Sequence, residues 1–294
     1  MDSWEVARVF RWTDAASLAC VIAAAAASFQ ARVSPRVAIG LDHIPVAVRD
    51  LDAASATYRA LGFALKPGRP HANGIRNAHV KFPDGAGIEL LTVPAAVDPL
   101  SAKYTKMIRA GDGPAFLSFH ARDIAALHAA LVAGGYAFDD ANGLTDLRTP
   151  ALDFLFWVQD NRSPTDRPDH FAHPNGAKAL GAVWIATDEG EALARLLVQL
   201  GGRRAQRDVL APTPVAATVV TLSEGDVFIL PARHQLLKGR PIVGASFQVT
   251  DLATVRRTLS GAGIAPWAGP GADARIVVEP SKAHGLWLEF RRGE

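Results

Sequence analysis

Two side chains in the first third of the chain, His43 and Glu89, have the types and surroundings of a polar site. His43 lies in the strand-like run Leu41–Val48, on the face opposite the branched apolar residues. Glu89 lies in Gly87–Val93 on a face shared with leucine and valine, where an ionised carboxylate is costly unless paired or metal-bound. Imidazole nitrogen and carboxylate oxygen suit divalent Fe, Mn, Zn or Ni. The pair is therefore either half of a metal site or an internal hydrogen bond.

The elements around these residues repeat. A strand-like run, an aspartate and a helical segment that ends at glycine occur four times, with the aspartates at Asp50, Asp123, Asp188 and Asp251. Each aspartate is placed to cap a helix through its carboxylate, and each glycine to close it. Short extended runs follow each helix. The pattern predicts an α+β fold of four β-α-β-β-β units.

The connections between units indicate the domain organisation. A helix is predicted from Asp98 to Ala110 between units one and two, whereas the proline-containing segment 160–176 between units two and three is a loop. We therefore expect domains at 39–175 and 176–294. Residues 1–38 form an extension that contains the apolar run Ala15–Ser28, which is too short to span a bilayer. This extension is a signal peptide, a helix or an upstream extension.

Composition narrows the class of protein. A formal net charge of +2 with scattered basic residues does not favour nucleic-acid binding. The single cysteine, Cys20, excludes an internal disulfide and a cysteine-based zinc site. We expect a cytoplasmic protein with no membrane or nucleic-acid partner, and the family resemblance described next implies a small-molecule ligand and a monomeric or homodimeric state.

The repeated units resemble the vicinal oxygen chelate superfamily, which includes glyoxalase I, extradiol dioxygenases and bleomycin-resistance proteins. Residues from about 41 to 186 are similar to its glyoxalase-like family. The matching pieces are Leu41-Asp42-His43, Arg49-Asp50-Leu51-Asp52, Leu61-Gly62-Phe63, Pro67–His71 with Gly74 and Asn77, Ile88–Leu91, and His173–Ala177. The resemblance implies that units pair so that their sheets curl into cups, with the helices outside. It also implies that any metal is held on the cup floor by residues of the first and fourth strands of each unit.

The resemblance makes His43 and Glu89 the ligands from the first unit and leaves the second unit incomplete. His43 precedes Asp50, and the residue that precedes Asp123 by the same distance in the chain is Phe116, which cannot coordinate a metal. His120 shares the face of Phe116 and is expected on the cup wall. Near the end of the closing strand, Asp160 is the predicted third ligand, with Gln159 as an alternative oxygen donor.

Further residues are expected to contact a ligand. His71 and Asn77 lie in or beside a loop placed by the resemblance at the cup rim, where His71 is either catalytic or an ordinary surface histidine. Phe116 and Phe156 belong to an aromatic cluster that either lines the cup or simply fills the core. The later units have Gly181 and Gly244 in place of a first-strand histidine. In these units only Glu289 is an acid at a position that resembles that of Glu89.

Two main hypotheses follow for function. The first is a metal-assisted lyase, isomerase or dioxygenase for a small oxygenated substrate, with Glu89 transferring a proton. The second is a metal-independent binding protein of the bleomycin-resistance type, or a relative without activity. The His43–Glu89 pair favours the first hypothesis and Phe116 favours the second.

Overall fold

The computed structural model describes residues 37–69, 71–141 and 143–293. The predictions for the N-terminal extension therefore lie outside the described residues, apart from residues 37 and 38. Five α-helices are present in the described part of the chain, and no helix there is long and apolar enough to cross a membrane. The helices are α2 (Leu51–Ala60), α3 (Pro99–Ala110), α4 (Ile124–Ala133), α5 (Gly190–Gln199) and α6 (Leu252–Gly261).

Aspartate capping begins three of the four repeat helices. Asp50, Asp123 and Asp251 each accept hydrogen bonds from backbone N–H groups in the first turn of α2, α4 and α6. The prediction for Asp188 is wrong, because α5 begins one residue later, after Glu189, with no side-chain cap. The Thr187 hydroxyl accepts from the Glu189 N–H, which forms a local turn just before the helix.

The first two units build two five-stranded sheets. The first sheet has the order β3 (Lys66–Pro67), β4 (Arg76–Lys81), β5 (Gly87–Thr92), β2 (His43–Ala47) and β6 (Gly113–Pro114). The second has the order β1 (Ile39–Leu41), β7 (Leu117–Ala121), β10 (Leu155–Val158), β9 (Leu144–Leu147) and β8 (Phe138–Ala141).

One antiparallel seam joins these two sheets. Leu41 pairs with Phe119 and Val46 with Pro114, so the register stays constant across the break between β1 and β2. At the break, the Asp42 N–H donates to the Ser118 carbonyl at 3.0 Å. The seam therefore brings the first strands of units one and two side by side and fixes Asp42 between the sheets.

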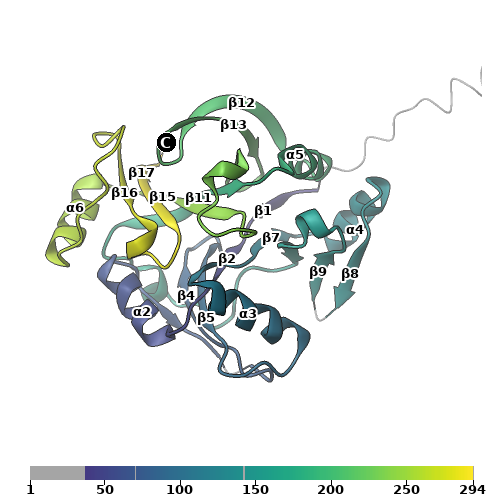
Figure 1. Cartoon of the computed structure of the whole chain (residues 1–294), viewed down its shortest axis with the longest axis horizontal. Coiled ribbons are helices and arrows are strands. Elements are labelled where there is room, and N and C mark those ends of the chain that lie inside the picture. Colours follow the sequence, from purple (N-terminus) through teal and green to yellow (C-terminus); the bar gives the residue numbers. More distant parts are fainter. Residues whose placement is uncertain (1–36, 70, 142, 294) are drawn as a thin grey trace, which may run out of the picture. The chain divides into compact units, whose positions relative to one another are not determined.

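The third and fourth units form one seven-stranded sheet, around the antiparallel central pair β11 and β15. Its order is β12 (Arg203–Leu210), β13 (Pro214–Thr221), β14 (Asp226–Leu230), β11 (Ala177–Ala186), β15 (Ile242–Val249), β17 (Trp287–Arg292) and β16 (Arg275–Val278). The predicted mixed α+β architecture is confirmed, with open, cup-like sheets and helices α2, α4 and α6 at their periphery (Figure 1).

The fourth unit has one strand fewer than the predicted pattern. Between α6 and β16 the chain contains Pro266 and Pro270, which lack the N–H group that a strand ladder needs. A single ladder-like bond remains there, from the Trp267 N–H to the Val277 carbonyl at 2.7 Å.

Side chains from the first and fourth units share one aromatic core. Phe63 lies 5.1 Å from Phe247 and 5.8 Å from Phe290, measured between ring centroids. His173 packs on this cluster and accepts from the Ala64 N–H, while Asn175 donates to the Leu61 carbonyl. The linker residues therefore hold α2 against the later strands by turn and capping bonds.

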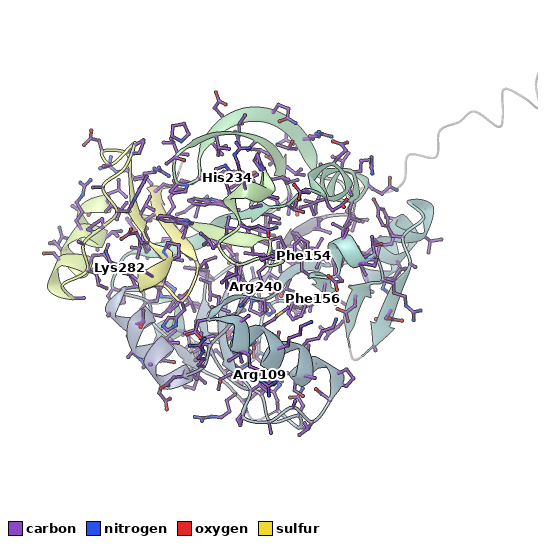
Figure 2. The ribbon with its side chains drawn as sticks, in the orientation of Figure 1. Arg109, Phe154, Phe156, His234, Arg240 and Lys282 are labelled. Carbon is purple, nitrogen blue, oxygen red and sulfur yellow. The ribbon has the colours of Figure 1, made fainter. Side chains whose placement is uncertain are left out.

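Arg240 fixes the connection between α3 and β6. Its side chain is buried, and its guanidinium donates to the carbonyls of Met107, Gly111, Gly113 and Pro114 (Figure 2). Burial lowers the pKa of Arg240 to about 10, which leaves the side chain charged at neutral pH. Arg240, from the segment between β14 and β15, thus holds the C-terminal end of α3 in place.

Candidate functional site

His43 begins strand β2 and is oriented by the residue before it. Asp42 lies at the break between β1 and β2 and is 3 % exposed. Its Oδ2 atom is 2.6 Å from His43 Nδ1 and also accepts a hydrogen bond from the Ser118 hydroxyl at 2.7 Å. A buried carboxylate with two partners holds the ring so that Nε2 points away from Asp42.

Glu89 meets the other ring nitrogen of His43. Its Oε2 atom lies 3.4 Å from His43 Nε2, and its Oε1 atom accepts from the Asn77 amide at 2.5 Å. The same amide nitrogen lies 3.1 Å from His71 Nε2. The predicted site residues His43, Glu89, Asn77 and His71 are therefore joined by one ion pair and by hydrogen bonds, and Asp42 extends this chain.

The strand register explains why these side chains converge. Glu89 on β5 pairs directly with His79 on β4 and with Pro45 on β2, so it faces the same side as both. His43 precedes Pro45 by two residues and therefore also shares that side. The cup face of the first sheet carries His43, His79 and Glu89.

The charges on this face are strongly coupled. Burial would lower the pKa of His43, but the charges and hydrogen bonds of Asp42 and Glu89 raise it to about 10. Burial would raise the pKa of Glu89, but His43 and the Asn77 amide lower it to about 2. Burial lowers the pKa of His79 to about 4. At neutral pH the floor therefore holds an imidazolium between two carboxylates, beside a neutral His79.

An aromatic residue of the second sheet, Phe156, faces this ion pair, and Phe116 packs beside the same sheet. The Phe156 ring stands edge-on to His43 at 5.7 Å between centroids, and Phe116 stands edge-on to Tyr104 of α3 at 5.3 Å. Figure 2 shows Phe154 and Phe156 beside the centre of the molecule. Phe116 is buried and Phe156 is half-buried, so both contribute to an apolar wall.

Phe116 and Phe156 stand where the second unit would have to supply metal ligands. In the first unit His43 pairs with Gly87, and Glu89 follows two residues later. In the second unit the Leu117–Leu155 pair places Phe116 beside Phe154, and Phe156 follows two residues later. The register therefore matches Phe116 to His43 and Phe156 to Glu89.

A divalent metal does not fit the residues present as a complete site. His43 and Glu89 supply two donors, and the matching positions of the second unit carry phenyl rings. Across the described ranges, no group of three or more histidine, cysteine, aspartate or glutamate side chains is arranged to hold a metal ion.

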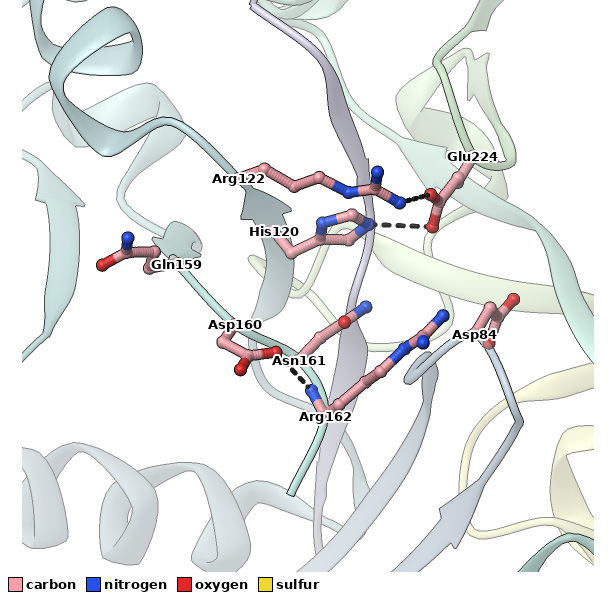
Figure 3. Close-up of a pocket in the computed structure, with 8 residues that line it drawn as sticks. All are labelled: Asp84, His120, Arg122, Gln159, Asp160, Asn161, Arg162 and Glu224. Carbon is pink, nitrogen blue, oxygen red and sulfur yellow. Dashed lines mark hydrogen bonds and ion pairs between the residues drawn. The ribbon is translucent and has the colours of Figure 1, made fainter. Parts of the chain in front are cut away.

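Asp160 and His120 lie in a different place. They line an open polar pocket of about 620 Å³, which also includes residues from the hairpins of units one and three (Figure 3). The other lining residues are Asp84, Arg122, Gln159, Asn161, Arg162 and Glu224. His120 is buried, and its Nε2 atom lies 3.0 Å from Glu224. Asp160 accepts from the Arg162 N–H. The structure does not bring Asp160 to His43 and Glu89, and its role as a ligand stays a prediction.

The ligand-like acid of the fourth unit is fully engaged by protein groups. Glu289 is 4 % exposed and lies 3.0 Å from Arg275 Nη1. Its other oxygen accepts from the Ser246 hydroxyl at 2.5 Å, and Ser246 in turn accepts from the Trp184 indole N–H. A separate apolar cluster around Trp184 and Phe228 fills this part of the sheet. Glu289 therefore stabilises the fold there.

Sequence reasoning missed three residues of the first cup. In a continuous strand, alternation would place Asp42 on the face opposite to its neighbour His43. The strand breaks at Asp42, between β1 and β2, and the sequence does not reveal this break. His79 belongs to no motif of the sequence that indicates a site, although it pairs with Glu89. Tyr104 lies on α3, whose place relative to the sheets depends on contacts distant in sequence.

Solved structures with the same fold include dioxygenase-type enzymes. A 4-hydroxymandelate synthase mutant from Streptomyces coelicolor matches with 13 % identity and a TM-score of 0.65, over 87 % of this chain and 93 % of that chain. A homoprotocatechuate 2,3-dioxygenase variant from B. fuscum matches with 12 % identity and a TM-score of 0.61, over 89 % and 73 %. A hypothetical protein from Staphylococcus aureus matches with 14 % identity and a TM-score of 0.59, over 87 % and 100 %.

These structures share the fold that the repeated units build. The model of the glyoxalase-like domain matches residues 41–201, more than half of the chain, and the chain belongs to that family. No curated protein sequence matches the chain.

Proposed function

We propose that the first two units bind a small oxygen-bearing molecule between the His43–Glu89 floor and the Phe116–Phe156 wall, without needing a divalent metal. The observation that supports this most strongly is the pair of phenyl rings at the two positions that would complete a metal site. Aromatic rings there offer stacking surface to a ligand instead of coordination.

The polar floor would orient such a ligand. Glu89 is ionised at neutral pH and is an acceptor for a ligand hydroxyl or amine, while Asn77 holds its other oxygen. His43 compensates the charge of Glu89, so the carboxylate is kept in a partly buried place where an unpaired anion would be costly. His71 extends the chain of hydrogen bonds towards the rim.

A second candidate function, a metal-assisted enzyme, is supported by a different observation. The 3.4 Å between His43 Nε2 and Glu89 Oε2 is compatible with two ligands that each lie about 2.1 Å from one ion. Several structures with the same fold are named as dioxygenases. A metal held there would need ligands from outside the protein, such as water or substrate.

The two functions are separated by ligand binding in the presence and absence of metal. Catechol, homoprotocatechuate and 4-hydroxymandelate would be titrated by calorimetry into metal-stripped protein, and again after addition of Mn²⁺ or Fe²⁺. We expect at least one compound to bind metal-stripped protein, and Phe156→Ala to weaken that binding. Binding that appears only with metal, and is lost in His43→Ala, would support the enzyme instead. A wild-type protein that binds none of these compounds under either condition contradicts both.

A further inference from the structure

Tyr104 reaches the first cup from a helix that belongs to neither sheet. Its side chain is 5 % exposed and stands perpendicular to Phe116. The helix α3 is fixed at its start by a capping box between Asp98 and Ser101, and just beyond its end by Arg240. The position of the phenol ring is therefore well determined by residues outside the cup.

Within residues 37–293, as far as they are described, no hydrogen bond joins the Tyr104 hydroxyl to another group, and this hydroxyl is not among the fully enclosed polar atoms without a partner. It therefore keeps access to solvent and is free to donate. Tyr58 also lacks a partner, but its hydroxyl is enclosed within the core on α2, next to Phe63. These two tyrosines differ in their electrostatic surroundings, because the carboxylates Glu89 and Asp146 act on the pKa of Tyr104, whereas burial alone acts on the pKa of Tyr58.

Those carboxylates come from both sheets. Asp146 on β9 pairs directly with Phe156 on β10, and therefore leaves the sheet on the face that Phe156 presents to His43. Burial, followed by the charges of Glu89 and Asp146, raises the pKa of Tyr104 well above its usual range. The phenol therefore stays protonated and is a hydrogen-bond donor at neutral pH.

We infer that the Tyr104 hydroxyl donates a hydrogen bond to an oxygen of the ligand and is a specificity-determining residue of the cup. Glu89 accepts and Tyr104 donates, so the matching ligand is a ring-bearing molecule that presents an acceptor oxygen and a hydroxyl or amine donor. The inference rests on the proposed small-molecule site and names the class of molecule that this site selects.

The test compares Tyr104→Phe with the matched control Tyr58→Phe, because each removes only one phenolic hydroxyl. Two probes would be titrated by NMR into metal-stripped protein: catechol, which has donor and acceptor oxygens, and toluene, which has neither. We expect Tyr104→Phe to weaken catechol binding about 2- to 12-fold, as for one hydrogen bond, and to leave toluene binding unchanged. Tyr58→Phe should change neither.

The outcomes separate this inference from the proposed function. Catechol binding of wild-type strength by Tyr104→Phe overturns the role of the hydroxyl and leaves the binding site intact. A lower melting temperature, together with equal losses for both probes, indicates a structural role and also overturns it. Wild-type protein that binds neither probe contradicts the proposed site itself, and with it the inference.

Discussion

His43 Nε2 lies 3.4 Å from Glu89 Oε2, and each of these residues has a second partner on its far side. Asp42 binds the other nitrogen of His43, and Asn77 binds the other oxygen of Glu89. The ion pair is therefore complete without a ligand. Its charges are compensated within the protein, which is why the floor can remain ionised beside an apolar wall.

This pair predicts how stability depends on pH. Folding raises the pKa of His43 from 6.5 to about 10, so its contribution is complete below pH 6.5 and is lost as the pH rises towards 10. Folding lowers the pKa of Glu89 from 4.5 to about 2, so its contribution is complete above pH 4.5 and is lost as the pH falls towards 2. Urea unfolding at a series of pH values should show greatest stability between these limits.

Two variants identify the residue that causes the loss of stability at alkaline pH. His43→Gln should flatten the decline between pH 6.5 and 10. His79→Gln should leave that decline unchanged, because burial lowers the pKa of His79 to about 4 and its titration affects only the acidic side. An alkaline decline that is equally steep in His43→Gln and wild type would show that another group causes it.

A metal site should appear when the second unit is given donors. The double variant Phe116→His, Phe156→Glu places a histidine and a glutamate at the positions that match His43 and Glu89. Without metal we expect a loss of about 3 kcal/mol in the free energy of unfolding, because polar groups replace buried rings. Zn²⁺ or Mn²⁺ should restore stability and bind at least tenfold more tightly than to wild type, a difference of about 1.4 kcal/mol.

Elemental analysis of the purified variant and calorimetric titration measure this gain. Adding His43→Ala to the double variant is the control, since it removes one donor from the first unit and should abolish the gain. A folded double variant that binds no more metal than wild type would mean that the four positions do not converge on one point.

Local patterns in the sequence were sufficient to predict the fold and the contribution of the first unit to the cup. Strand alternation placed His43 and Glu89 on a face away from the helices, and the aspartate–glycine spacing located α2, α4 and α6. Both signals depend on residues within one element or one turn. Asp188 is not a cap because α5 begins one residue later than the pattern predicts, after a local turn in which Thr187 accepts from the Glu189 N–H.

The rest of the cup depends on how strands distant in sequence are aligned. Asp160 is the acid nearest to the end of the predicted closing strand, whereas the β7–β10 register puts Phe156 at the matching position. The bond between Asn77 and Glu89 likewise requires the β4–β5 register. Tyr104 enters the cup because Arg240, far along the chain, fixes the end of its helix.

The buried pair Arg275–Glu289 should behave as one unit in the fourth repeat. Both side chains are almost fully buried, so Arg275→Met or Glu289→Leu alone leaves a charge without its partner and should cost about 3–5 kcal/mol. The double variant removes both charges and should cost clearly less than the sum, with a coupling energy of about 1–3 kcal/mol. Urea unfolding of the four proteins measures this cycle.

The exposed pair Arg204–Glu191 provides the matched control cycle, for which a coupling of about 0–1 kcal/mol is expected. Additive losses at Arg275 and Glu289 would mean that each is held by its other hydrogen bonds, to backbone carbonyls and to Ser246. Catechol binding to the double variant distinguishes the two cups. Unchanged binding places the ligand in the first cup, beside Glu89 and its partner His43, whereas lost binding in a folded variant would place it beside Glu289.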